Sequence, residues 1–211
     1  MTKRRDWTWK TADPAANARL HLKYEPGNWG DVLKGAWLVP VAREVAKRLQ
    51  RQYSPLPPIP HSHGGRGTAT VAPPSLAGKG AGGLGAVREV RYLDPFAGAP
   101  SYPLLEASAQ RLELLPDGEH LERLRPYAER GEWPSCALLA RDTLRAHGAT
   151  PKLLVFDAHA QARELWTKSP DAEVLALASG EDAFERRARK QFAPDLVLLD
   201  MSLPGENGLA V

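Results

Sequence analysis

The sequence predicts an α/β fold built on a mostly parallel sheet. From residue 87 onward, short apolar runs of strand length alternate with segments of helical periodicity. Each run is nearly continuous in apolar residues, which is typical of parallel strands that are buried on both faces. A chain of 211 residues with 43% hydrophobic content is also long enough to bury a sizeable core.

The first predicted element is a helix that precedes the alternating region. An apolar stripe begins at Val32 and recurs about every fourth residue, at Leu33, Trp37, Val41, Val45 and Leu49. Asn28 is a candidate N-cap, and Asp31 places a negative charge near the positive end of the helix dipole. Pro40 lies inside this segment, so we expect it to kink the helix or split it in two.

Residues 1–53 are predicted to form a basic N-terminal arm and helix. Residues 1–52 hold 11 Lys and Arg against 5 Asp and Glu, a net charge of +6, whereas the remainder has a net charge of −3. This asymmetry favours a surface that meets phosphates, although basic residues can equally serve to solvate a helix. Residues 54–86 are rich in Pro and Gly, which predicts a flexible insertion. His61 and His63 in that insertion have no further ligands nearby, so no metal site is predicted.

The remaining residues, 87–211, are predicted to form a Rossmann-like domain. Its four strands are expected at residues 87–94, 152–157, 172–179 and 195–200. Helices are expected at residues 104–112, 133–148, 160–170 and 180–192. Gly148 is the expected C-terminal cap of the second of these helices.

Aspartates gather at the ends of the predicted strands. Asp94, Asp157 and Asp200 end three strands, and Asp182 follows the strand expected at residues 172–179. The carboxyl ends of parallel strands meet at one edge, where such sheets bind ligands. Small residues after Asp94 let the backbone approach a ligand, and an acid after the second strand can accept hydrogen bonds from a ribose diol. This arrangement favours a nucleoside-bearing cofactor, of which S-adenosylmethionine is the commonest to pair with an acid-rich loop.

Six separated stretches resemble the RlmJ-like family, which methylates the N6 atom of an adenine in large-subunit ribosomal RNA. The most specific is YEPGNWGDVLKG, which is similar to the family's G-N-x-x-D-V-L-K-H element. The others, in the family's order, are RYLDPFAGAPSYP, WPSCALLARDTLR, LLVFDAH, EDAF and LVLLDMSLPGE. Together they cover most of residues 24–206 outside the Pro/Gly-rich insertion.

The resemblance implies a class I methyltransferase sheet and S-adenosylmethionine-dependent methylation of adenine N6 in ribosomal RNA. Asp200 would be the catalytic residue, because the matching family acid accepts hydrogen bonds from the target amine. Asp157 would hold the ribose of the cofactor, Asp182 its adenine, and Asp94 its methionine side. The full set of implied cofactor-binding residues is Asn28, Lys34, Asp94, Phe96, Gly98, Cys136, Asp157, Asp182 and Ala183. Ribosomal RNA would be the partner, and neither DNA nor a membrane is expected.

Several positions depart from the family pattern. Gly35 and Phe96 stand where the family carries histidine, Pro100 where it carries the last glycine of the loop, and Cys136 where it carries serine. The family's D-P-P-Y motif has become Asp200-Met201-Ser202-Leu203-Pro204, so no aromatic residue follows to stack on a flipped-out base. Further strands, normal for such a methyltransferase, would follow Val211. We therefore expect a truncated sheet, weak cofactor binding and slow or undetectable methylation by this chain alone.

Two alternatives remain open. Residues 152–211 also resemble part of a response-regulator receiver, with Asp200 as phosphoacceptor. A receiver needs two adjacent acids after its first strand to hold Mg²⁺, whereas Ala158 follows Asp157 here. The second alternative is a catalytically degenerate module that only binds RNA or cofactor.

Composition bounds the setting of the protein. The single cysteine, Cys136, excludes an internal disulfide, which is typical of a reducing compartment. The basic N-terminus is not followed by the apolar segment of a signal peptide, and no apolar run reaches the length of a transmembrane helix. We therefore expect a cytoplasmic protein.

Overall fold

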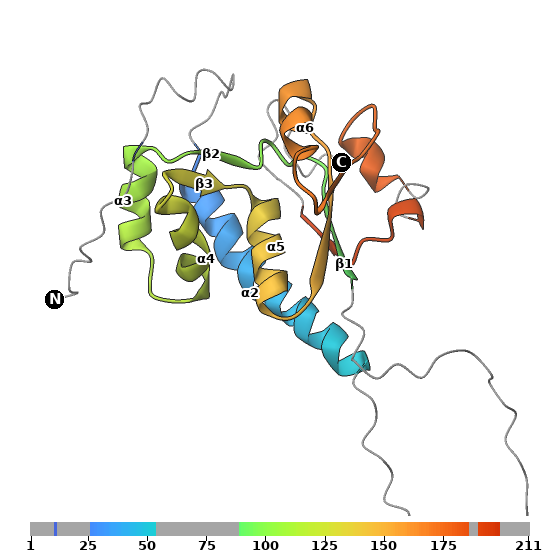
Figure 1. The fold of residues 1–211 in the computed structure, drawn as a ribbon, viewed down its shortest axis with the longest axis horizontal. Coiled ribbons are helices and arrows are strands. Elements are labelled where there is room, and N and C mark those ends of the chain that lie inside the picture. Colours follow the sequence, from blue (N-terminus) through green and yellow to red (C-terminus); the bar gives the residue numbers. More distant parts are fainter. Residues whose placement is uncertain (1–10, 12–25, 54–88, 186–189, 199–211) are drawn as a thin grey trace, which may run out of the picture.

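The computed structural model describes residue 11 and residues 26–53, 89–185 and 190–198. It has an α/β architecture with a four-stranded sheet in the order β5-β4-β1-β6 (Figure 1). The strands are β1 (Glu89–Asp94), β4 (Thr150–Val155), β5 (Ala172–Val174) and β6 (Leu196–Val197). Every neighbouring pair among these four strands is parallel, so the predicted fold class is confirmed at this level.

The strand order places β1 in the middle of the sheet. The chain passes from β1 to β4 and then to β5 on one side, and afterwards returns to add β6 on the other side of β1. In open parallel sheets, the point where the order reverses leaves a crevice outside the carboxyl ends of the two strands that flank it, and ligands bind there. In this sheet, that point lies between β1 and β6.

Helices cover the sheet because its strands are apolar on both faces. The long α2 (Trp29–Tyr53) and α5 (Cys136–Ala146) pack side by side on one face (Figure 1). Ala42 and Ala46 of α2 meet Val90 and Leu144 there. On the other face, Leu93 and Leu154 pack against a cluster that includes Phe156, Leu175 and Ala183. The remaining helices are α3 (Glu106–Leu114), α4 (Glu119–Ala128), α6 (Ala160–Trp166) and a 3-10 turn, η1 (Glu181–Phe184).

A second, two-stranded sheet was not predicted from the sequence. It pairs β2 (Ser101–Pro103) with β3 (Glu132–Pro134) in antiparallel register, with Tyr102 opposite Trp133. Each strand is only three residues long, and this is too short for a periodic pattern to stand out. The pairing matters because it sets two aromatic side chains against each other beside the carboxyl end of β1.

The helix α2 differs from expectation in two respects. It continues through Pro40 as one 25-residue helix and is not split. The buried residues Leu38, Val39 and Ala42 flank Pro40 and hold both halves of the helix in the core. Leu33, Trp37 and Val41 of the predicted apolar stripe are exposed, whereas Val32 is buried and Val45 and Leu49 pack against the core. The buried face of α2 carries Ala42 and Ala46, which let α5 approach closely. The Asn28 cap is confirmed, since its Oδ1 accepts a hydrogen bond from the Asp31 amide at 3.2 Å.

The later elements are shorter than predicted. The strand expected at 172–179 ends at Val174, and the helix expected at 180–192 is a 3-10 turn over 181–184 followed by helical residues 190–192. Gly148 closes α5 with a φ of +73°, which confirms its predicted role. The predicted insertion at 54–86 and Asp200 lie outside the described residues.

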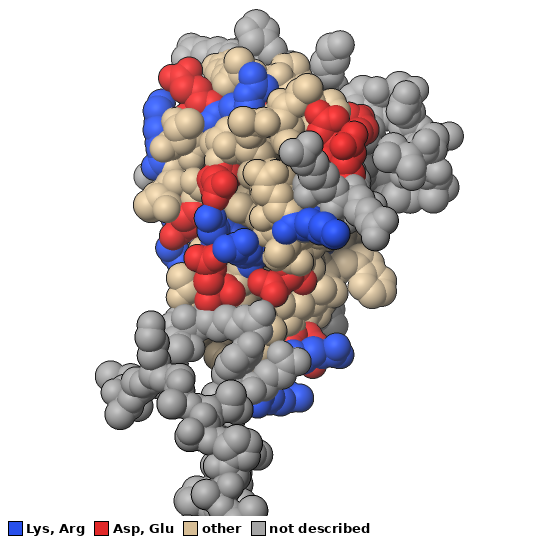
Figure 2. All heavy atoms as spheres, turned by 90° about the vertical axis from the view of Figure 1, so that its right-hand side faces the viewer, with Lys and Arg blue, Asp and Glu red and all other residues tan. Residues whose placement is uncertain are grey.

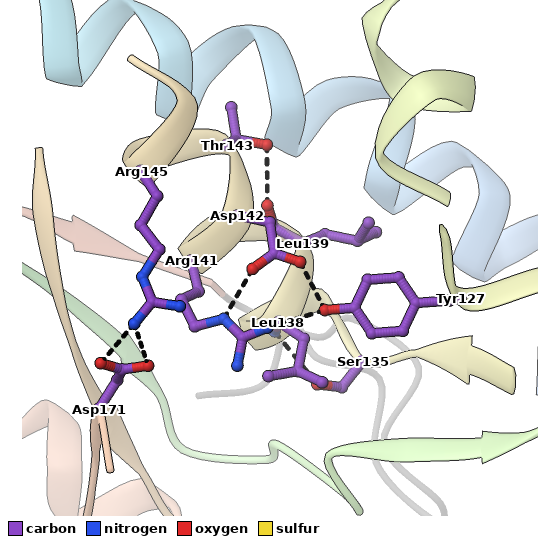
Figure 3. A network of polar contacts seen from close by, with 9 residues as sticks. All are labelled: Tyr127, Ser135, Leu138, Leu139, Arg141, Asp142, Thr143, Arg145 and Asp171. Carbon is purple, nitrogen blue, oxygen red and sulfur yellow. Dashed lines mark hydrogen bonds and ion pairs between the residues drawn. The ribbon is translucent and has the colours of Figure 1, made fainter. Parts of the chain in front are cut away.

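A network of partly buried and exposed polar contacts holds α5 against its neighbours (Figure 3). The Tyr127 hydroxyl on α4 donates to Asp142 Oδ2 at 2.5 Å, and Arg141 Nε donates to Asp142 Oδ1 at 2.7 Å. Burial, and after it the Asp142 carboxylate, raises the pKa of Tyr127, so this hydroxyl remains a donor at neutral pH. Arg145 binds both carboxylate oxygens of Asp171, the residue before β5, at 2.6 and 2.7 Å. These contacts tie the C-terminal part of α5 to α4 and to the residue before β5.

Candidate functional site

An open pocket lies at the carboxyl ends of β1 and β6, where the strand order reverses. Its enclosed volume is only about 50 Å³, below the ~300–1,000 Å³ of typical small-molecule sites, so a larger ligand would extend beyond it. Asp94, the last residue of β1, and Leu198, which directly follows β6, both line it. The other lining residues come from α2, the loop after β1, the strands β2 and β3, and the start of α5: Asp31, Lys34, Phe96, Ala97, Tyr102, Trp133, Pro134, Ser135, Cys136 and Leu139.

Asp94 supplies a buried carboxylate to this pocket. Its residue is only 4% exposed, and its two oxygens accept hydrogen bonds from the Tyr92 hydroxyl at 3.3 Å and the Phe96 amide at 3.2 Å. Burial raises the pKa of Tyr92, and the nearby Asp94 and Cys136 raise it further. Tyr92 therefore stays protonated and donates to Asp94, which fixes the direction of the carboxylate.

Three aromatic side chains, those of Phe96, Tyr102 and Trp133, also line the pocket. The register of the small sheet places Tyr102 directly opposite Trp133. The Tyr102 hydroxyl accepts a hydrogen bond from the Ala99 amide at 2.9 Å, which ties this ring to the loop after β1. Aromatic faces combined with carboxylates favour organic cations and flat heterocycles.

The α2 helix contributes one charge of each sign to the pocket. Asp31 Oδ2 accepts a hydrogen bond from the Gly27 amide at 2.9 Å, and Lys34 Nζ lies 3.7 Å from Asp31 Oδ1. Asn28, predicted to touch the cofactor, caps the same helix one turn earlier. The predicted site residues Asn28 and Lys34 therefore lie in the same part of α2 as Asp31, which the sequence indicates only as a helix-dipole residue.

Asp157 joins the loop after β4 to the loop after β1. Its Oδ2 accepts a hydrogen bond from the Gly98 amide at 2.9 Å, and its Oδ1 accepts one from the His159 amide at 2.8 Å. Gly98 has a φ of +60°, and its carbonyl accepts a hydrogen bond from the Trp166 indole at 2.8 Å. Asp157 does not line the pocket itself, but each carboxylate oxygen keeps a second lone pair for a ligand.

Asp182 organises the next loop in the same way. Its Oδ2 accepts hydrogen bonds from the Ala178 and Ser179 amides at 3.1 and 2.9 Å. This loop packs on the loop after β1, because a Cβ placed on Gly180 would lie 2.7 Å from Phe96 Cζ. Phe96 therefore contacts both the Asp182 loop and the pocket.

The structure thus brings four predicted site residues together around the pocket: Lys34, Asp94, Phe96 and Cys136. Gly98 belongs to the loop after β1, and Asp157 and Asp182 belong to the two loops beside it. Ala183 is fully buried in the core under the sheet, so its side chain is not exposed to a ligand. Asp200 lies outside the described residues. Sequence reasoning did not single out Tyr102 or Trp133, although both belong to stretches that carry the family resemblance.

The described part of the chain contains no cluster of three or more His, Cys, Asp or Glu side chains that could hold a metal ion. His61 and His63 are not among the residues searched. Over the same residues, no helix combines the length and the hydropathy needed to cross a membrane.

No protein-family model matches this chain, and no curated protein shows significant similarity to it. The family resemblance therefore rests on the six stretches of sequence alone.

Proposed function

We propose that this protein binds S-adenosylmethionine in the pocket at the carboxyl end of β1 and is related to methyltransferases that act on adenine N6 of ribosomal RNA. The observation that carries the proposal is the position of the pocket. It lies where the order β5-β4-β1-β6 reverses, which is the ligand-binding crevice of dinucleotide-type sheets.

The chemistry of the pocket fits this cofactor. The sulfonium of S-adenosylmethionine is an organic cation, and the Asp94 carboxylate with the rings of Phe96 and Trp133 favours positive charge. Lys34 offers a cation to the carboxylate of the methionine moiety. Asp157 and Asp182, which hold the two adjacent loops, are the acceptors for the ribose and the adenine. The bound cofactor would supply an electrophilic methyl group.

The target of methylation is inferred from the resemblance. Asp200 is the acid that would accept hydrogen bonds from the adenine amino group, two residues beyond Leu198 of the pocket. Because no aromatic residue follows Asp200 to stack on an extruded base, we expect this protein to bind such a base less tightly than family members do. We expect cofactor binding to be easier to detect than turnover.

The strand order argues against the receiver alternative. In the receiver fold, the first strand pairs directly with the third. The corresponding strands of residues 152–211 would be β4 and β6, but β1 lies between them and pairs with both. The second alternative, a degenerate module that binds RNA or cofactor without transferring a methyl group, would use the same pocket. It would differ from the proposal only in the absence of turnover.

Titration calorimetry of the full chain with S-adenosylmethionine and S-adenosylhomocysteine tests the proposal. We expect both to bind, and Phe96→Ala and Asp94→Asn each to weaken binding about tenfold or more, because each removes a pocket wall or its charge. Leu114→Ala, which removes an exposed side chain on α3, is the matched control and should bind as the parent does. Absence of heat with either ligand, together with Mg²⁺-dependent labelling of Asp200 by acetyl phosphate, would replace the proposal with the receiver alternative.

A further inference from the structure

One side of α2 exposes four large apolar side chains. Trp29 is 50% exposed, Leu33 58%, Trp37 74% and Val41 44%. They are spaced four residues apart, so they form a strip about 18 Å long on one side of the helix. We call these four residues the α2 strip. Scattered exposed apolar residues are ordinary, but a continuous row of this size marks a contact surface.

Beyond the α2 strip, the charged side chains of the helix are mainly basic. Residues 44–51 carry Lys47, Arg48 and Arg51 against a single acid, Glu44, which is paired with Arg48 at 3.1 Å. The α2 strip therefore continues into turns with a net positive charge. On the face shown in Figure 2, acidic and basic side chains are interleaved over the described residues.

The α2 strip also begins beside the pocket. Asp31 and Lys34, which line the pocket, lie on α2 between Trp29 and Trp37. Lys34 and Trp37 are three residues apart, so their side chains are neighbours on the helix surface. A ligand that lies along the strip would reach the pocket without leaving α2.

We propose that α2 is a docking track for a single-stranded segment of nucleic acid, with unpaired bases stacked on Trp37 and Trp29 and phosphates held by Lys47, Arg48 and Arg51. Charge complementarity selects this occupant, because exposed aromatic rings followed by cations are the combination that binds single strands. A purely apolar protein groove would gain nothing from the basic turns. The inference rests on the proposed function in one respect, namely that the docked strand delivers the base to be modified.

Fluorescence anisotropy with a labelled, unstructured oligoribonucleotide tests this docking on the full chain. Trp37→Ala should weaken binding about 5- to 150-fold, the range for losing one stacked base. Trp37→Phe keeps an aromatic face and should retain most of the affinity, whereas Trp37→Leu keeps apolar area without a face and should bind as poorly as Trp37→Ala. Leu114→Ala, an equally exposed apolar truncation on α3, should leave affinity unchanged.

The contribution of the basic residues of α2 is measured separately, from the salt dependence of binding. Arg51→Gln should lower the slope of log affinity against log salt by about one and weaken binding to all sequences alike. Glu113→Gln, an exposed change on α3, should leave that slope unaltered.

Three results would overturn the inference: no binding of the oligoribonucleotide by the parent chain, parent-like affinity in Trp37→Ala, or parent-like affinity in Trp37→Leu. In the last case the strip is a site for an apolar protein surface. Analytical ultracentrifugation checks whether that surface is a second copy, since Trp37→Ala would then abolish a dimer. Calorimetry with S-adenosylmethionine on the same variants reports the pocket independently, so loss of the track and loss of the cofactor site are distinguishable.

Discussion

The Asp157 carboxylate accepts a hydrogen bond from the Gly98 amide at 2.9 Å across 59 residues of sequence. This contact fastens the loop after β1, the central strand, to the loop after its neighbour β4. The Trp166 indole holds the same glycine from its carbonyl side. The loop after β1, which lines the pocket, therefore depends on Asp157, which does not line the pocket itself. Asp157 is thus both a structural hydrogen-bond acceptor and a candidate cofactor-binding residue.

Replacing Asp157 with alanine should lower the free energy of unfolding by about 1–3 kcal/mol, because the Gly98 and His159 amides lose their acceptor. Asp157→Asn keeps one acceptor oxygen and should cost less. Urea denaturation of both variants measures the difference, with Glu113→Ala as an exposed-carboxylate control. Equal stability of Asp157→Ala and the parent would show that water replaces the carboxylate at no cost.

Gly35 and His120 should be energetically coupled. A Cβ on Gly35 of α2 would overlap the imidazole of His120 on α4, which is why glycine is tolerated inside this helix. Gly35→Ala should destabilise the protein by about 1–3 kcal/mol through overpacking. His120→Ala should recover much of that loss, and a double-mutant cycle by thermal denaturation measures the coupling. Additive effects would mean that the two helices separate freely to make room.

Tyr127→Phe isolates the hydroxyl that binds Asp142. The ring remains, so the free energy of unfolding should fall by about 1.5–3 kcal/mol, the contribution of a hydrogen bond to a charged acceptor. Because Arg141 still neutralises Asp142, the helix should remain folded. Chemical denaturation gives the value. A stability change near zero would indicate that Arg141 alone satisfies the carboxylate.

Glu119 should make stability depend on pH in the acidic range. Burial acts to raise the pKa of Glu119, but His147 and Arg123 outweigh it and hold the pKa below its ordinary value of 4.5. Arg43 also binds the second carboxylate oxygen, at 3.3 Å. A lowered pKa in the folded state means that the stabilisation is complete above pH 4.5 and is lost as the pH falls through the folded value.

Glu119→Gln should therefore be less stable than the parent at pH 7, and the gap should close well below pH 4.5. Parallel melting curves over this range measure it, with the exposed Glu113→Gln as control. A gap that stays constant with pH would assign the effect to packing instead of charge.

Local features of the fold were predictable from the sequence. The continuous apolar runs ending at Asp94 and near Asp157 predicted two of the four strands, because buried parallel strands need apolar residues on both faces. Gly148 and Asn28 were predicted as caps, since the reasons for a cap lie within one helical turn.

The tertiary structure decided what local pattern could not. The close approach of α5 decided which side of α2 is buried. Ala42 and Ala46 are buried on that side, whereas Trp37 is exposed. Tyr102 and Trp133 became a pocket wall only because two three-residue strands pair. Asp157 binds the Gly98 amide because strand order makes β1 and β4 neighbours. Periodicity and capping are short-range properties that a sequence carries directly. Helix faces, pocket walls and loop contacts depend on long-range packing, which only the assembled core sets.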